Sequence, residues 1–121
     1  MEKTKTQEEK QELKEKITSE KLAKYFDVTS RALKKVKLDS DVVVDSKKSG
    51  ADFLDMAQRY FEDAKHFEKS GDFVNAFAAL NYAHGWLDAG ARLGFFDVDG
   101  DNVLFTVDKE HVAQIKKHKN S

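Results

Sequence analysis

The sequence predicts an all-α protein: a three-helix bundle built on a long antiparallel helical hairpin, with a small C-terminal β-hairpin or short helix appended. Proline is absent from all 121 residues, which suits long uninterrupted helices. Apolar residues recur at helical spacing in three segments. The last two segments are separated only by Ser70-Gly71-Asp72, and so short a turn makes them antiparallel neighbours.

The first predicted helix, Leu13–Leu38, follows a charged flexible N-terminus at residues 1–12. Its apolar residues stand mostly three to five positions apart, so one face is apolar. Thr18 or Ser19 is suited to cap its ordered part, because a hydroxyl oxygen accepts from free backbone N–H groups there. We expect this helix to cover one side of the hairpin, within a single domain of residues 13–107.

Residues 39–50 interrupt the helical spacing. Their valine run is either a short extended piece or a loop, and we expect a loop whose valines tuck against the bundle. The second helix opens at Ser49, Gly50 or Asp52 and carries one apolar stripe. Gly71 suits the left-handed position that ends it.

The third helix, Phe73–Leu93, is apolar around most of its circumference, is capped by Asp72 and stops at Gly94. Such a helix is usually buried on several sides. We expect the other two helices, the tail or a second copy of the protein to cover it. Gly85 and Gly90 lie inside it, each less favourable than alanine by about 1 kcal/mol. A close backbone or a large ring is expected to compensate.

The C-terminal segment begins with two short β-like runs, Phe95–Val98 and Val103–Val107. The Asp99-Gly100 pair between them is a hairpin signal, so we predict a two-stranded hairpin packed on the third helix. The polar tail of residues 108–121 is expected to add a short helix at 108–118, capped by Asp108.

Polar residues form a row along the third helix. Four of them fall within about 80° of one another: Asn81, His84, Asp88 and Arg92. One hypothesis is a polar network, internal or between subunits, that fixes helix register. The other is a ligand or nucleotide site in which Arg92 takes an anion and His84 a proton. Trp86 lies beside the row and completes the candidate binding residues. The row offers no nucleophile, so no catalytic residue is predicted.

Two groups of side chains suggest metal sites: Asp63, His66 and His84, and Asp97, Asp99, Asp101 and Asp108. The first group has too few ligands converging on one point. The second has the acidic spacing of a calcium loop, but Asn102 replaces the required glycine and Asp108 the bidentate glutamate. A turn explains these residues more simply. No metal and no cofactor is predicted.

Net charge is −1, which predicts no global attraction to nucleic acid or membranes. The charge is uneven: residues 1–37 carry 11 Lys and Arg against 7 Asp and Glu, whereas residues 51–94 carry 4 against 7. There is no cysteine for disulfides, no apolar run long enough to span a bilayer, and no apolar N-terminal core of a secretory signal. We expect a cytoplasmic protein without membrane contact.

Two resemblances involve the hairpin. It resembles a single tetratricopeptide-type unit at Tyr60, Ala64, Phe67, Gly71, Phe73, Ala76, Leu80 and Ala83. The run YFEDAKHFEKSGDFVNAFAALNYAHGWLDAGARLGFFDV also resembles an archaeal family of short proteins, domain of unknown function 357, over residues from roughly 18 to 98. Its specific part is NYAHGWLDAGARLG. This resemblance implies a small all-helical bundle and an archaeal cytoplasmic setting, and brings no established activity, cofactor or catalytic residue.

We expect a non-enzymatic protein-interaction or self-association module, because the third helix has more apolar surface than two short helices cover. The partner is then a second copy or another protein. The alternative is an RNA-associated helical module or small nuclease that uses His84, Asp88 and Arg92. In the motif of the small helical nucleases that this alternative resembles, an arginine comes before the histidine. Here the order is reversed, because His84 precedes Arg92.

Overall fold

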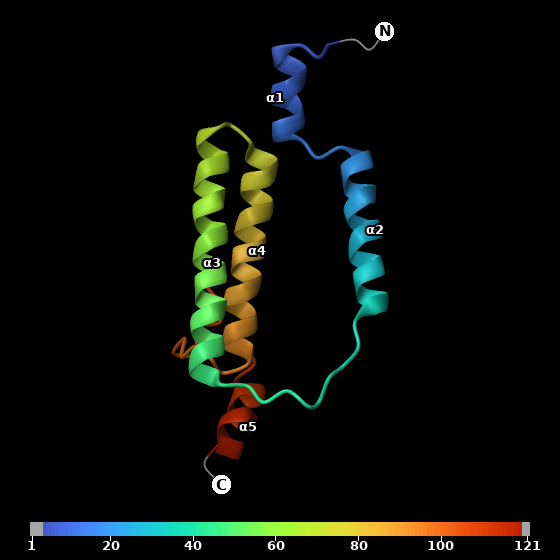
Figure 1. The fold of residues 1–121 in the computed structure, drawn as a ribbon. Helices are drawn as coiled ribbons and strands as arrows, with labels where there is room; N and C mark the ends of the chain where they lie inside the picture. The colour runs from blue at the N-terminus through green and yellow to red at the C-terminus, as the bar shows by residue number, and fades with distance from the viewer. Residues whose placement is uncertain (1–3, 120–121) are drawn as a thin grey trace.

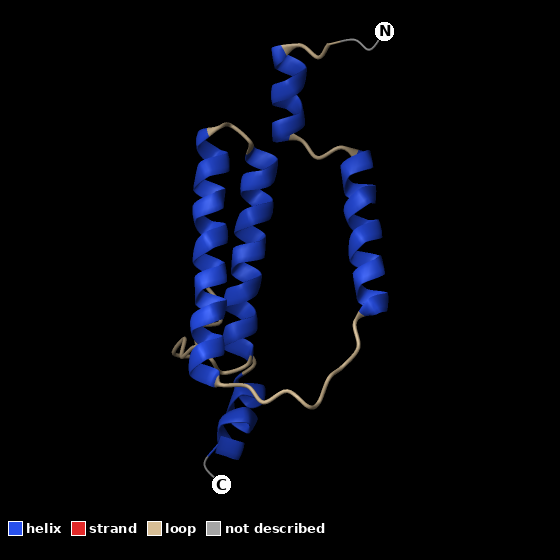
Figure 2. Cartoon of the chain, viewed as in Figure 1, coloured by secondary structure: helices blue, strands red, loops and turns tan. Residues whose placement is uncertain are grey.

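A computed structural model describes the backbone of residues 4–119 and the side chains of residues 4–116. The helices it contains are, in order, α1 (Gln7–Glu15), α2 (Ser19–Lys35), α3 (Ser46–Lys69), α4 (Phe73–Arg92) and α5 (Lys109–Lys119). α3 and α4 lie side by side as a hairpin, α1 lies near its turn, and α2 stands apart (Figure 1). Between residues 4 and 119 the helices are joined by loops and turns, without a strand (Figure 2).

The turn of the hairpin confirms the sequence-based prediction. Gly71 has φ +76°, the left-handed conformation that suits glycine after a helix. The Asp72 carboxylate then accepts from the backbone N–H of Asn75 at 3.2 Å and from its side-chain amide at 2.7 Å. This cap starts α4 at Phe73. At the other end, Gly94 has φ +79° and follows the last turn of the helix.

The start of α3 lies earlier than the predicted Ser49, Gly50 or Asp52, so that prediction is wrong. The Asp45 carboxylate accepts from the backbone N–H groups of Lys47 and Lys48 at 3.0 and 3.1 Å. This cap places the first helical residue at Ser46.

Small side chains form the buried part of the contact between α3 and α4. The buried apolar residues in the described chain are six alanines and one valine: Ala57, Ala64, Val74, Ala76, Ala79, Ala83 and Ala91. Alanines let two helix backbones approach closely, and they bury little side-chain volume of their own. The large apolar residues of the hairpin therefore stand beside this contact rather than inside it.

The two glycines inside α4 have different surroundings. An added Cβ at Gly90 would lie 2.6 Å from Cδ2 and 2.9 Å from Cζ of Phe96, and closer still to Cε2. The large ring predicted at Gly90 is therefore present. A Cβ at Gly85 would meet nothing within 4 Å, so the expected close neighbour is missing there.

The single helix predicted over Leu13–Leu38 is wrong, because it is broken into α1 and α2. Thr18 caps α2 through its side-chain oxygen, which accepts from the Lys21 N–H at 3.1 Å, so the predicted cap is confirmed. α1 begins inside the segment 1–12 that was predicted to be flexible. It is joined to the hairpin by a 3.0 Å hydrogen bond from Gln11 Nε2 to the Gly71 carbonyl. Residues 1–3 of that segment lie outside the described chain.

The predicted three-helix bundle does not form within this chain, because α2 does not pack along the hairpin. Lys21 Nζ of α2 donates a 3.4 Å hydrogen bond to Asn75 Oδ1 of α4. The valines of the following loop do not tuck against the hairpin either: Val43 is 95% exposed. The apolar pattern of α2 is correct, but its large apolar side chains stay exposed in the described part of the chain.

The predicted C-terminal β-hairpin is wrong, and the short helix is confirmed as α5. Asp97 and Asp101 accept hydrogen bonds from backbone N–H groups two and three residues ahead, which closes tight turns instead of a strand ladder. Asp108 caps α5 by accepting from the His111 N–H at 3.1 Å. Residues 120 and 121 of the predicted tail lie outside the described chain.

Candidate functional site

The polar row lies on the side of α4 that faces away from α3. At about 100° per residue, it is roughly opposite the buried face that includes Ala79, Ala83 and Gly90. His84 and Asp88 meet as predicted, with Nε2 and Oδ1 3.5 Å apart. Their side chains are 50% and 29% exposed, so the row is open to solvent.

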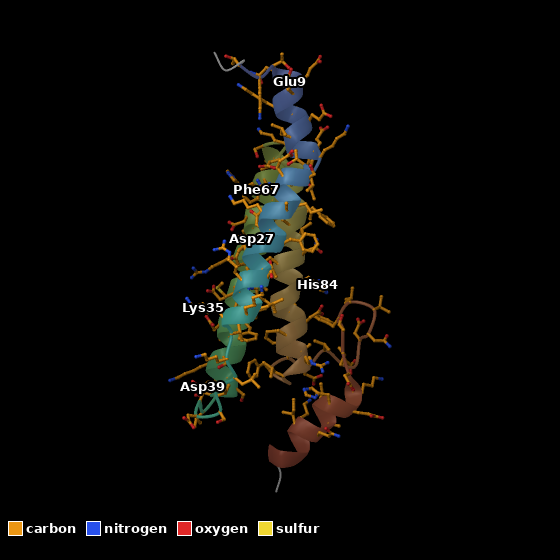
Figure 3. The ribbon with its side chains drawn as sticks, turned by 90° about the vertical axis from the view of Figure 1, so that its right-hand side faces the viewer. Glu9, Asp27, Lys35, Asp39, Phe67 and His84 are labelled. Atoms are coloured by element: carbon orange, nitrogen blue, oxygen red, sulfur yellow. The ribbon has the colours of Figure 1, made fainter. Side chains whose placement is uncertain are left out.

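Asp88 holds the segment that follows α4. Its Oδ1 accepts from the Thr106 backbone N–H at 2.9 Å. The Phe105 ring beside it stacks on the His84 imidazole, with centroids 6.3 Å apart and planes at 30°. Figure 3 shows His84 on the side of α4 toward which this segment approaches. The Asp88 carboxylate thus connects α4 to the segment around Thr106, which is a structural role.

The other two members of the row stand by themselves. Arg92 is exposed, and within residues 4–116 it forms no ion pair with Asp88, although the i,i+4 spacing favours one. Asn81 is also exposed, and its side chain makes no hydrogen bond to the described chain. The row is therefore one linked pair, His84 with Asp88, flanked by two free polar groups. It contains no nucleophile.

Trp86 lies on a different side of α4, in an aromatic cluster. Its ring meets Phe53 of α3 edge to face at 5.0 Å and Tyr82 at 6.4 Å. Tyr82 in turn meets Tyr60 at 4.4 Å. These rings join α3 to α4 along one side of the hairpin, and Trp86 is half-buried among them.

The opposite side of the hairpin carries an apolar groove of about 520 Å³, which we call the Leu80 groove. It is lined by Leu54, Ala57, Gln58, Phe61, Leu80, Asn81, Ala83, His84 and Leu87. Ala57 and Ala83 are buried at 4% and 5% exposure and form its floor. The large side chains along the groove remain open: Phe61 is 47% exposed and Leu80 is 44%.

A family model described as "Protein of unknown function (DUF357)" matches residues 24–96. The chain belongs to this family. The match confirms the predicted resemblance, and it spans most of α2, all of α3 and α4, and every residue of the Leu80 groove. α1 and α5 of this DUF357 protein lie outside it. The comparisons found no match among curated proteins and none among solved structures.

Within residues 4–116, the acidic and histidine side chains of this DUF357 protein do not converge on a metal position. In the described part of the chain, no three His, Asp or Glu side chains are grouped to hold an ion. The acidic run after α4 instead binds backbone: Asp97 accepts from Asp99 N–H, and Asp101 from Val103 and Leu104 N–H. None of the helices described here combines the length and apolar content that crossing a membrane requires.

Two parts of the site were missed by sequence reasoning. On α3 the Leu80 groove is lined by Leu54, Gln58 and Phe61. The seven-residue spacing of Leu54 and Phe61 places both on one side of the helix, and this spacing could have indicated the groove. Thr106 and Phe105 reach the polar row from 18 and 21 residues away along the chain. No pattern in the sequence indicates that contact.

Proposed function

We propose that this DUF357 protein is a non-enzymatic interaction module that self-associates through the apolar surface of its helices. The observation that carries the proposal is the distribution of side-chain sizes. In the described chain the buried apolar side chains are alanines and one valine, while large apolar side chains of every helix from α2 to α4 are exposed. Soluble monomers rarely present contiguous apolar surface of more than a few hundred Å², and larger patches mark interaction sites.

Several large apolar side chains of the single chain are mostly exposed to solvent. Phe26 of α2 is 69% exposed, Leu33 is 73% and Phe77 of α4 is 63%. Burying one such side chain fully is worth about 1.5–3 kcal/mol. Covering several of them by association therefore supplies a large driving force, which offsets the translational and rotational entropy lost on binding.

Light scattering coupled to size exclusion tests the proposal on the full chain. A mass well above the 13.8 kDa of one chain is expected at tens of micromolar, with a concentration-dependent shift toward the monomer on dilution. Trp86 emission, followed over the same dilution, reports whether the aromatic side of the hairpin takes part. A mass of 13.8 kDa over the whole concentration range contradicts self-association.

The second candidate is contact with RNA through the polar row, and the observation in its favour is that His84 and Arg92 both reach solvent on one side of α4. The Asp88 carboxylate between them and the net charge of −1 oppose binding of a polyanion. Binding and cleavage of labelled RNA at low salt, with His84→Ala as the control, test this use. No retention and no cleavage at low salt eliminates it.

A further inference from the structure

The apolar face of α2 is uncovered in this chain. At about 100° per residue, four large side chains of α2 share one side of the helix, and the C-cap residue continues it: Leu22, Tyr25, Phe26, Leu33 and Val36. Their exposures run from 51% to 73%. Most of the charged residues of α2 lie on the opposite side. α2 is therefore an amphipathic helix without a partner for its apolar face.

The Leu80 groove matches the apolar face of α2 in the spacing of its large side chains. Its floor is alanine, and its large side chains stand seven residues apart on each helix, Leu54 with Phe61 and Leu80 with Leu87. Phe26 and Leu33 on α2 have the same seven-residue spacing, which is two helical turns or roughly 10 Å. Two side chains of a docking helix thus match the two ends of the groove in register, as in helix-in-groove recognition.

Charge favours the same pairing. α2 carries five Lys and Arg against two Asp and Glu, whereas residues 51–94, which form most of the hairpin, carry four against seven. A basic helix approaching an acidic hairpin is attracted to it and is less attracted to another α2.

The α2 of the same chain is held on another side of its hairpin. The Lys21 side chain donates a hydrogen bond to the side chain of Asn75, which lies about 140° around α4 from Leu80. In Figure 3 most of α2 runs in front and to the left of α4, whereas the segment that carries Phe105 and marks the His84 side lies to the right. The chain thus presents two matching apolar surfaces that do not meet each other.

We propose that α2 of a second copy of this protein occupies the Leu80 groove, and that the exchange is reciprocal. Each chain then donates one helix and accepts one, which closes a two-fold dimer and covers both apolar surfaces at once. The proposal rests on the self-association proposed above and names its surfaces. Both surfaces lie almost wholly within residues 24–96, the part of the chain matched by the family model.

A charge-exchange pair tests this arrangement. Phe26→Lys places a cation on the docking helix, and Leu80→Glu places an anion in the groove. Each variant alone is expected to weaken the dimer at least about tenfold, because its two docking contacts bury an unpaired charge. In an equimolar mixture, the lysine helix of one variant meets the glutamate groove of the other, and the remaining contact is wild type. The mixture is expected to recover a heterodimer.

Matched controls use exposed apolar residues outside the two surfaces. Val28→Lys changes the charged side of α2, and Val103→Glu adds an anion at an 89% exposed valine in the segment after α4. Both are expected to keep the wild-type dimer. Far-UV circular dichroism checks that every variant is helical, which the exposure of Phe26 and Leu80 leads us to expect.

The outcomes separate this inference from the proposed function. A wild-type chain that is monomeric throughout overturns self-association and the exchange together. A wild-type dimer that persists in both single variants, or a mixture that stays monomeric, leaves self-association standing and overturns the α2 pairing.

Crosslinking distinguishes exchange between chains from docking within one chain. The protein has no cysteine, so a Phe26→Cys, Leu80→Cys double variant carries the only two thiols. Oxidation of the exchanged dimer is expected to give a covalent dimer on a non-reducing gel. A crosslinked species of monomer mass, formed by a closed single chain, overturns the exchange.

Discussion

Alanine substitutions at Gly85 and Gly90 form a matched pair inside α4. Both replace glycine by a better helix former, so both gain the same propensity term of about 1 kcal/mol. They differ in what the new methyl group meets. At Gly85 there is nothing within 4 Å, whereas at Gly90 the methyl would overlap the Phe96 ring. The difference between the two variants therefore isolates the packing of Phe96 on α4.

The expected magnitudes follow from these two terms. Gly85→Ala is expected to stabilise the protein by roughly 0.5–1 kcal/mol. Gly90→Ala adds an overpacking cost of about 1–3 kcal/mol, which exceeds the propensity gain, so a net loss of about 1 kcal/mol is expected. The free energies of unfolding of the two variants should then differ by about 1–3 kcal/mol.

Urea denaturation followed by far-UV circular dichroism measures both free energies, at one protein concentration because self-association links stability to concentration. Repeating the pair in a Phe96→Ala background completes a double-mutant cycle. Without the ring, Gly90→Ala is expected to stabilise as much as Gly85→Ala. Equal stabilisation by both substitutions in the wild-type background would refute the packing of Phe96 on Gly90.

Three further predictions concern single residues. Asp72→Ala removes the cap on Asn75 N–H and is expected to lower stability by about 1 kcal/mol in urea denaturation. Gly71→Ala forces a side chain into φ +76° and is expected to cost about 1 kcal/mol in the same assay, so an unchanged midpoint would contradict the turn geometry. Asp88→Ala removes the acceptor of the Thr106 N–H, so residues 97–107 are expected to exchange amide hydrogens faster while the hairpin keeps its protection.

The hairpin could be predicted from sequence because its signals are local. Gly71 needs a left-handed conformation and Asp72 needs free N–H groups, and both requirements are met within four residues. The start of α3 was misplaced because Asp45 is as good a cap as the later residues, and the sequence gives no rank among them.

The wrong predictions mostly concern how segments far apart in the sequence pack together. The periodicity of α2 correctly predicts an apolar face, but periodicity carries no information about which surface covers that face. The Asp99-Gly100 pair predicts a turn. The flanking runs form further turns instead of strands, because the carboxylates of Asp97 and Asp101 accept hydrogen bonds from nearby backbone N–H groups. The bond between Thr106 and Asp88 depends on that loop conformation, so it could not be predicted either.

In the hairpin of α3 and α4, the side chains buried between the helices differ from the large apolar side chains that remain exposed. Ala57 and Ala83 are buried between the helices, while Phe61 and Leu80 stand at the edge of the contact and are 47% and 44% exposed. If these side chains form the interface proposed above, substitutions at the edge are expected to change binding while the alanine contact keeps the hairpin closed. The hairpin fold and the proposed binding surface of this chain are therefore expected to respond separately to mutation.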